Sequence, residues 1–310
     1  MTKNLKFYLI FLLMLTKSMI NSQESDVNEN KKSLTMIWET KPVFKTPESV
    51  VFDSKRNCLY VSNFNTRGGF VSRNDKTRDE FISRVKMNGE IDDLHWATGL
   101  LNPTGLAIYD DSLFVVERDS IVKIDLKNAE IQKRFLIKNT FFLNDITFDN
   151  EGTAFITDNS RKVQETSVYN LKNEIVTPFL SKDRVFRPNG INTIGNKIIT
   201  FDYTQRCLVW IHKQNQNVSK IAEFPNINTV DGLQIFSDDE YIISDFAGKI
   251  YFIDKTGKTS ILFDAKSIVS QERPKINCTD LLFISKEKWI IVPTFFDNRL
   301  IAFQINGHLL

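Results

Sequence analysis

The sequence predicts an all-β fold, a six-bladed β-propeller, and two observations support this prediction. Helical periodicity is hard to find after residue 33, whereas apolar-alternating runs, each followed by a turn and a second β-branched or aromatic run, recur along the chain. Six of the first runs share a phase and recur about every 40 to 56 residues, which is the spacing of four-strand propeller blades with insertions.

Each first run opens with an oxygen-bearing side chain and carries an apolar residue two positions later. The six runs are ESVVF from Glu48, TGLAI from Thr104, NDITF from Asn144, NGINT from Asn189, DGLQI from Asp231 and TDLLF from Thr279. A second strand follows each run and ends in a polar or turn-forming group, as a hairpin should. These second strands are CLYVSN, LFVVER, AFITDN, IITFD, YIISD and WIIVPT.

Two further segments have an expected place in the ring. Residues 67–80 are rich in glycine and charge and fall in the longest interval, so we expect a loop between the second and third strands of blade one. Residues 34–40, LTMIWET, have no local partner, and we expect them to form the outer strand of the last blade. That closure removes an exposed strand edge that would otherwise invite aggregation.

The first residues of the chain have the layout of a signal peptide. Lys3 and Lys6 precede an apolar run from Phe7 to Leu15, and small and polar residues follow up to Ser22. This run is much shorter than the roughly 20 residues that a membrane-spanning helix needs. We therefore expect cleavage near Ser22 and no stable membrane anchor.

The predicted domain organisation follows from these segments. Residues 1–22 form the signal peptide, the uniformly polar residues 23–33 form a disordered spacer, and residues 34–310 form the propeller domain. The mature protein is then secreted or periplasmic, and we expect a monomer.

The composition limits the classes of partner. The chain has 40 Lys and Arg against 38 Asp and Glu, so its charges nearly cancel, and no basic stripe interleaved with aromatic residues is present. This balance argues against nucleic acid and leaves a small-molecule substrate as the expected partner.

Cysteine and histidine are few, and neither occupies one of the six ring positions. Cys58, Cys207 and Cys278 are an odd, scattered set flanked by strand-like residues, which predicts buried small hydrophobic side chains rather than disulfides or metal ligands. His95 is expected in the loop between blades one and two. If the protein is a hydrolase, its base or nucleophile should therefore be a carboxylate.

The first residue of each run is the position that predicts chemistry. The innermost strands of a propeller surround one channel, so these six residues should meet around its axis. All six carry oxygen, two are acidic, two are amides and none is basic. Carboxylate and amide oxygens without His or Cys favour Ca²⁺ over zinc or copper. Taken singly, each residue is also explained as the turn residue that begins a strand.

The same elements resemble those of the regucalcin/gluconolactonase family, the senescence-marker-protein-like propellers. The resemblance rests on PES at the first run, the Asn-Asp of FLND, RPNG and VDGL, and it extends over about residues 36–305. This family also resembles the calcium phosphotriesterase propellers of the diisopropylfluorophosphatase type. The resemblance implies a divalent metal held by Glu48, Asn144, Asn189 and Asp231, and hydrolysis of a lactone or ester-like substrate at that metal.

Two departures from the family pattern bear on the substrate. Gluconolactone-type members have an arginine two residues before the blade-three asparagine, where this chain has Phe142. Arg187, on the corresponding face of blade four, could replace that cation, or it could be a surface arginine before a proline. Pro-Glu-Ser also stands where Glu-Gly-Pro is common. We expect Arg187 and Phe142, together with Thr104 and Thr279 of the ring, to contact the substrate.

The expected mechanism assigns one role to each polar residue. Asp231 acts as the catalytic base or nucleophile, Glu48 balances the charge of the ion, and the two asparagines act as neutral ligands. Asp145 and Asp280 follow ring residues and are expected to point away from the axis and support the strand starts. The alternative is a non-catalytic propeller in which a metal holds the blades together and the channel mouth binds a ligand or partner.

Overall fold

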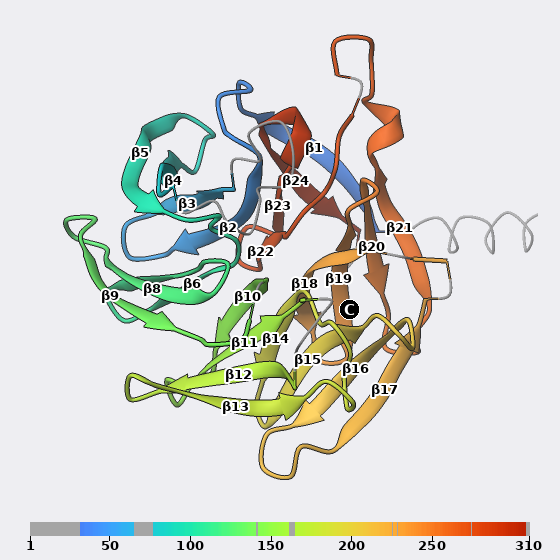
Figure 1. Cartoon of the computed structure of the whole chain (residues 1–310). Coiled ribbons are helices and arrows are strands. Elements are labelled where there is room, and N and C mark those ends of the chain that lie inside the picture. Colours follow the sequence, from blue (N-terminus) through green and yellow to red (C-terminus); the bar gives the residue numbers. More distant parts are fainter. Residues whose placement is uncertain are drawn as a thin grey trace, which may run out of the picture.

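The computed structural model describes residues 32–64, 77–140, 142–160, 165–224, 226–227, 229–273 and 275–307. They form six antiparallel sheets of four strands each, arranged in a ring (Figure 1). The predicted six-bladed β-propeller is therefore confirmed. Within each blade the chain runs outward from the first strand, which lies beside the axis, because consecutive strands pair as hairpins.

The strands of the first three blades follow the predicted repeat. Blade one contains β2 (Pro47–Asp53), β3 (Cys58–Asn63), β4 (Glu80–Lys86) and β5 (Ile91–Leu100). Blade two contains β6 (Leu106–Tyr109), β7 (Ser112–Val116), β8 (Ser120–Asp125) and β9 (Ile131–Leu136). Blade three contains β10 (Leu143–Phe148), β11 (Ala154–Asp158), β12 (Thr166–Lys172) and β13 (Ile175–Ser181).

The last three blades complete the ring. Blade four contains β14 (Ile191–Ile194), β15 (Lys197–Asp202), β16 (Cys207–His212) and β17 (Val218–Glu223). Blade five contains β18 (Val230–Ser237), β19 (Glu240–Asp245), β20 (Lys249–Ile253) and β21 (Thr259–Asp264), with the 3-10 helix η1 (Ala265–Ser267) after it. Blade six contains β22 (Leu282–Ile284), β23 (Trp289–Pro293), the 3-10 helix η2 (Phe295–Asp297), β24 (Leu300–Asn306) and β1 (Ser33–Glu39).

The first strand of the described chain closes the ring, as predicted. β1 pairs antiparallel with β24 as the outer strand of blade six, so the two ends of the propeller domain share one sheet. Ser33, expected in the spacer, is the first residue of β1 and pairs with Asn306. The spacer prediction placed the strand start one residue too late, because a polar residue at the rim of a strand cannot be told from linker by composition.

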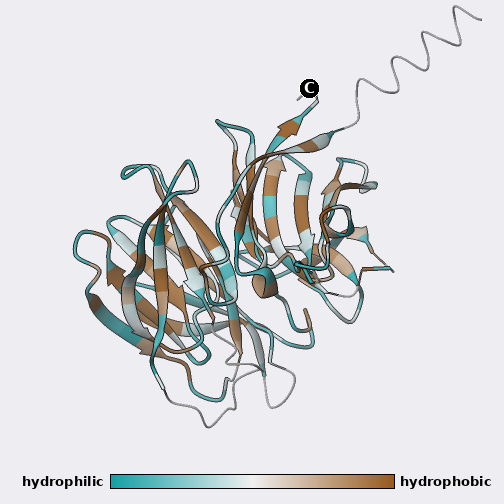
Figure 2. Cartoon of the chain, turned by 90° about the horizontal axis from the view of Figure 1, so that it is seen from above, coloured by the Kyte–Doolittle hydropathy of each residue, from teal (hydrophilic) through white to brown (hydrophobic). Residues whose placement is uncertain are grey.

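Apolar side chains fill the junctions between the blades. The six buried clusters each join two neighbouring sheets, as with Tyr60 and Trp96 of blade one against Leu113 and Val115 of blade two. Figure 2 shows these hydrophobic residues alternating with hydrophilic ones along the strands. Because each blade buries both faces against a neighbour, the ring supplies the core that a single sheet lacks.

The three cysteines belong to this core. Cys58, Cys207 and Cys278 are buried and unbridged, and each lies in one of the clusters between blades. Burial raises the pKa of all three thiols, to about 11 for Cys207. The prediction that they act as small hydrophobic side chains is confirmed.

Several sequence predictions concern residues at the limits of the described chain. The signal peptide (1–22) and most of the spacer (23–33) lie outside it, as do residues 67–76 of the predicted blade-one loop. The described end of that loop leads into β4, whose first residue is Glu80. The prediction for His95 was wrong: it lies in β5, a longer strand than the charged sequence IDDLH suggested. The described residues contain no helix long and apolar enough to cross a membrane.

Candidate functional site

The backbone at the ring position alternates from blade to blade. In blades one, three and five the ring residue is the second residue of the inner strand, and a β-bulge follows it. In blades two, four and six the ring residue precedes the inner strand by two or three positions. In both settings the regular ladder is interrupted at the axis, which leaves backbone groups available to the neighbouring blade.

Those backbone groups join consecutive blades around the axis. The carbonyl of one ring residue accepts a hydrogen bond from the preceding blade at five junctions: Gly105 N to Asn144 O (2.8 Å), Thr157 Oγ1 to Asn189 O (2.7 Å), Gly190 N to Asp231 O (2.8 Å), Ser244 Oγ to Thr279 O, and Asp280 N to Glu48 O (3.2 Å). The ring residues are thus neighbours in space although they are far apart in the sequence.

One cavity of about 160 Å³ opens over this ring. Five of the six predicted ring residues line it: Glu48, Asn144, Asn189, Asp231 and Thr279. Thr104 is fully buried beside them, and its hydroxyl donates to the carbonyls of Val116 and Leu143. The structure therefore brings together the four side chains expected to hold a metal.

Hydrogen bonds orient two of these side chains. Asn189 Nδ2 donates to Asp231 Oδ1 over 2.6 Å, which fixes both groups across the junction between blades four and five. Two buried oxygens at the cavity, Glu48 Oε2 and Asn189 Oδ1, have no hydrogen-bond partner within the described chain. Buried polar atoms are normally paired, so these two oxygens mark a place where a further group would be stabilised.

The electrostatics of the site point the same way. Burial, reinforced by the charges of Asp231, Asp280 and Asp145, raises the pKa of Glu48 well above its usual range. Burial and then the charge of Asp280 raise the pKa of Asp231 to about 7, and the hydrogen bond from Asn189 opposes this rise. None of the described residues that line the cavity is Lys, Arg or His. The carboxyl groups thus repel one another without a protein cation between them.

Asp145 and Asp280 lie on the opposite side of the ring. Both line a second cavity of about 240 Å³ that receives residues from all six blades, so the prediction that they point away from the axis was wrong. Their expected support of the strand starts is observed. Asp145 accepts from the backbone of Ile146 and, across a junction, of Ile191, and Asp280 accepts from Leu281 N and from Ser49 Oγ of blade one. That expectation assumed regular strand alternation, but Asp145 lies in a β-bulge and Asp280 precedes β22 by two residues.

The donor set fits a hard cation. No group of three or more His, Cys, Asp and Glu side chains arranged to hold a metal occurs in the part of the chain that the structure describes. The ring instead combines two carboxylates with two amides, and all four present oxygen. Calcium accepts this mixture of ligands, and two carboxylates match its charge. Glu48, Asn144, Asn189 and Asp231 are the residues that would hold it.

The two predicted substrate contacts outside the ring have different surroundings. Phe142 lines the cavity. Arg187 does not: its guanidinium donates to the backbone and side-chain oxygens of Asn159 and stacks over the ring of Tyr203 at 5.3 Å. Arg187 therefore packs behind Tyr203, which itself lines the cavity. Arg187 has a φ of 54°, a left-handed conformation that is uncommon for a residue with a side chain.

An aromatic wall lies above the ring, and Phe142 is its one member that was expected to contact the substrate. Phe64, Phe142, Tyr203, Phe246 and Phe295, from five blades, line the upper part of the cavity. Phe295 is both buried and part of this wall. Three of the five directly follow a second strand, so extending the comparison of second strands by one residue would have found them.

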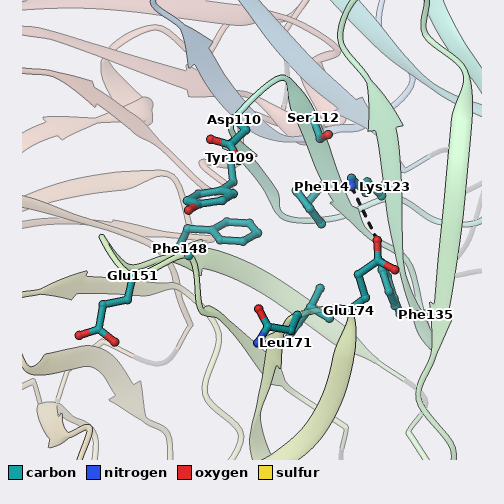
Figure 3. Close-up of a pocket in the computed structure, with 12 residues that line it drawn as sticks. Tyr109, Asp110, Ser112, Phe114, Lys123, Phe135, Phe148, Glu151, Leu171 and Glu174 are labelled. Carbon is teal, nitrogen blue, oxygen red and sulfur yellow. Dashed lines mark ion pairs between the residues drawn. The ribbon is translucent and has the colours of Figure 1, made fainter.

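A separate recess of about 300 Å³ lies at the junction of blades two and three (Figure 3). Tyr109 stacks on Phe148 at its floor, with ring centroids 4.8 Å apart, and Lys123 lies 3.9 Å from Glu174 at its side. None of the six ring residues lines it. Among the described residues that line it, the one cation, Lys123, is paired with an acid.

Comparisons with known proteins agree with the fold. No family model matches the sequence, and no curated protein matches it. Virginiamycin B lyase from Staphylococcus aureus is similar in structure with a TM-score of 0.57 and 14% identity, covering 91% of this chain and 90% of the lyase. A luciferin-regenerating enzyme has a TM-score of 0.57 and 15% identity, covering 90% of this chain and 98% of that enzyme.

A third similar structure is that of a protein described as calcium-binding. Regucalcin from Agrobacterium tumefaciens, described as a calcium-binding protein, has a TM-score of 0.60 and 13% identity, covering 87% of this chain and 94% of regucalcin. At these identities the comparisons establish architecture. The chain is therefore a six-bladed β-propeller with the fold shared by regucalcin, luciferin-regenerating enzyme and virginiamycin B lyase.

Proposed function

We propose that this protein is an exported calcium-dependent hydrolase of the gluconolactonase-like class, which opens a lactone or ester-like substrate in the central channel. The observation that carries the proposal is the cavity above the ring, where oxygen side chains from four blades converge and two buried oxygens lack a partner. Proteins with this fold include regucalcin, which is described as calcium-binding. The signal-peptide layout of residues 1–22 supports export.

Each polar side chain at the cavity has a separate role in such a reaction. When bound, Ca²⁺ would polarise the carbonyl oxygen of the substrate. Asp231 accepts a proton from water or attacks the carbonyl carbon. Asn189 Nδ2 donates to Oδ1 of Asp231 and so holds the Asp231 carboxylate in one orientation. Glu48 supplies the second negative charge, and Asn144 offers a neutral oxygen at the same cavity.

Lyase chemistry receives less support from this site. One of the similar structures is a catalytically inactive histidine-to-alanine variant of virginiamycin B lyase. In this chain no described histidine lines the channel cavity, since His95 is exposed in β5 and His212 lies at the end of β16. A carboxylate-based hydrolysis is the reaction that the cavity residues can perform.

A substrate panel with and without a chelator tests the proposal. Glucono-δ-lactone, dihydrocoumarin, phenyl acetate and an aryl phosphotriester are each incubated with the protein in excess calcium and then in EDTA. We expect hydrolysis of at least one lactone or ester, loss of activity in EDTA, and its return when calcium is restored. Calcium-dependent thermal stability without hydrolysis of any substrate would instead favour the non-catalytic propeller.

A further inference from the structure

The aromatic wall has a regular origin in the repeat. Phe64, Tyr203 and Phe246 are the residues immediately after β3, β15 and β19, the second strands of their blades. The backbone N–H groups of Phe64 and Phe246 donate to the carbonyls of Thr46 and Thr229, two residues before Glu48 and Asp231. This backbone pairing places the aromatic side chains directly beside the polar ring.

Neighbouring contacts hold the wall in a fixed shape. The centroids of Phe64 and Phe295 lie 6.0 Å apart, and those of Phe246 and Phe295 lie 5.5 Å apart, which are favourable aromatic distances. The hydroxyl of Tyr203 donates to Val230 O over 2.7 Å. The polar end of Tyr203 is therefore occupied by backbone, and its ring is what it offers to the cavity.

Blade two differs at the corresponding position and contributes no aromatic residue. Glu117 follows β7, is fully buried, and accepts two hydrogen bonds of 2.9 Å from Arg78 Nη1. Leu101 N and Ser120 Oγ also donate to its carboxylate. Glu117 is thus used within blade two, and it does not line the cavity.

The polar groups available above the ring are few. Among the described residues, Thr229 is the one other polar lining residue besides the ring and Tyr203, and its hydroxyl donates to Asp245. A polyhydroxylated substrate would leave its hydroxyl groups unpaired against aromatic rings, which is unfavourable. The cavity of about 160 Å³ is close to the ~150 Å³ that accommodates a benzene molecule.

We propose that the aromatic wall binds a phenyl-sized apolar group of a neutral lactone or ester, so that the substrate is not a sugar lactone. This inference rests on the proposed hydrolase for the reaction, but the binding of the apolar group does not depend on turnover. It can therefore be tested separately with a ligand that cannot be hydrolysed.

The binding test uses phenylacetone, a neutral aryl ketone, with sorbitol as the polyhydroxylated comparison. Calorimetry on the folded protein should detect phenylacetone and not sorbitol. Phe142→Ser and Phe246→Ser, two half-buried wall residues in different blades, should each weaken phenylacetone binding at least 10-fold. Phe179→Ser, a half-buried residue of the outer strand β13, is the matched control and should leave binding unchanged. Equal binding by all four proteins would overturn the proposal.

The kinetic test compares two six-membered lactones, dihydrocoumarin and glucono-δ-lactone. In Phe142→Ser the kcat/KM for dihydrocoumarin divided by that for glucono-δ-lactone should fall at least 10-fold, mainly because the KM for dihydrocoumarin rises. Phe179→Ser should retain the original ratio. An unchanged ratio in Phe142→Ser contradicts the wall as the specificity determinant. In another outcome, the wild-type protein binds phenylacetone and the wall variants lose that binding, but no substrate is hydrolysed. That result would support the apolar binding site and overturn only the proposed hydrolase activity.

Discussion

Asp231→Asn is expected to lower kcat for the best lactone or ester substrate by about 10² to 10⁴, the usual contribution of a positioned base. Asparagine keeps the size of the side chain and cannot accept the proton or attack the carbonyl. Steady-state kinetics in saturating calcium measures the effect. The substitution also removes one of four mutually repelling buried carboxyl groups, so the melting temperature in EDTA should not fall.

Asp238→Asn is the matched control for this experiment. Asp238 is exposed in the turn between β18 and β19 of the same blade, so its loss should alter neither kcat nor metal dependence. An Asp231→Asn protein that hydrolyses the substrate at the full rate would exclude Asp231 as base or nucleophile.

The second large effect is expected on stability, at the junction of blades five and six. A Cβ at Gly232 would lie 2.5 Å from Leu281 N and 2.8 Å from Asp280 Cα, so Gly232→Ala must push two backbones apart. Overpacking of this kind costs about 1–3 kcal/mol or more. For a domain of this size each kcal/mol lowers the melting temperature by about 2–4 °C, so we expect a decrease of roughly 2–12 °C.

A control glycine separates this close approach from backbone strain. Gly195 has a φ of 53° and nothing within 4 Å of the position that a Cβ would take. Gly195→Ala therefore carries only the left-handed strain of about 1 kcal/mol, and thermal unfolding should show a smaller decrease than for Gly232→Ala. A larger loss at Gly195 would mean that the junction between the blades adapts to the added methyl group.

The architecture was predictable because two periodicities coincide in this sequence. Alternation within each run gives the strand faces, and the common phase of the runs from Glu48 to Thr279 gives the blades and their shared axis. Residues 34–40 could be assigned to the last blade because an unpaired apolar strand needs an edge. The cluster of ring residues follows from the same repeat.

The details that the sequence did not reveal depend on departures from the regular strand. Asp145 and Asp280 were expected to face away from the axis, but hydrogen bonds across the blade junctions, and at Asp145 a β-bulge, direct them to the channel. Arg187 was expected at the substrate, but Asn159, which is distant in sequence, binds its guanidinium. Three of the five aromatic wall residues lie just beyond the second strands, where hydrophobic alternation has already ended.

Calcium titration by calorimetry measures whether side chains from four blades bind one ion. The wild-type protein should bind one calcium per chain, and Glu48→Gln and Asp231→Asn should each weaken that binding by at least about 100-fold, since each removes one of the two carboxylate charges. Asp238→Asn should bind as the wild type does. A protein that binds no calcium, or that binds it equally well without Glu48 and Asp231, would contradict the account.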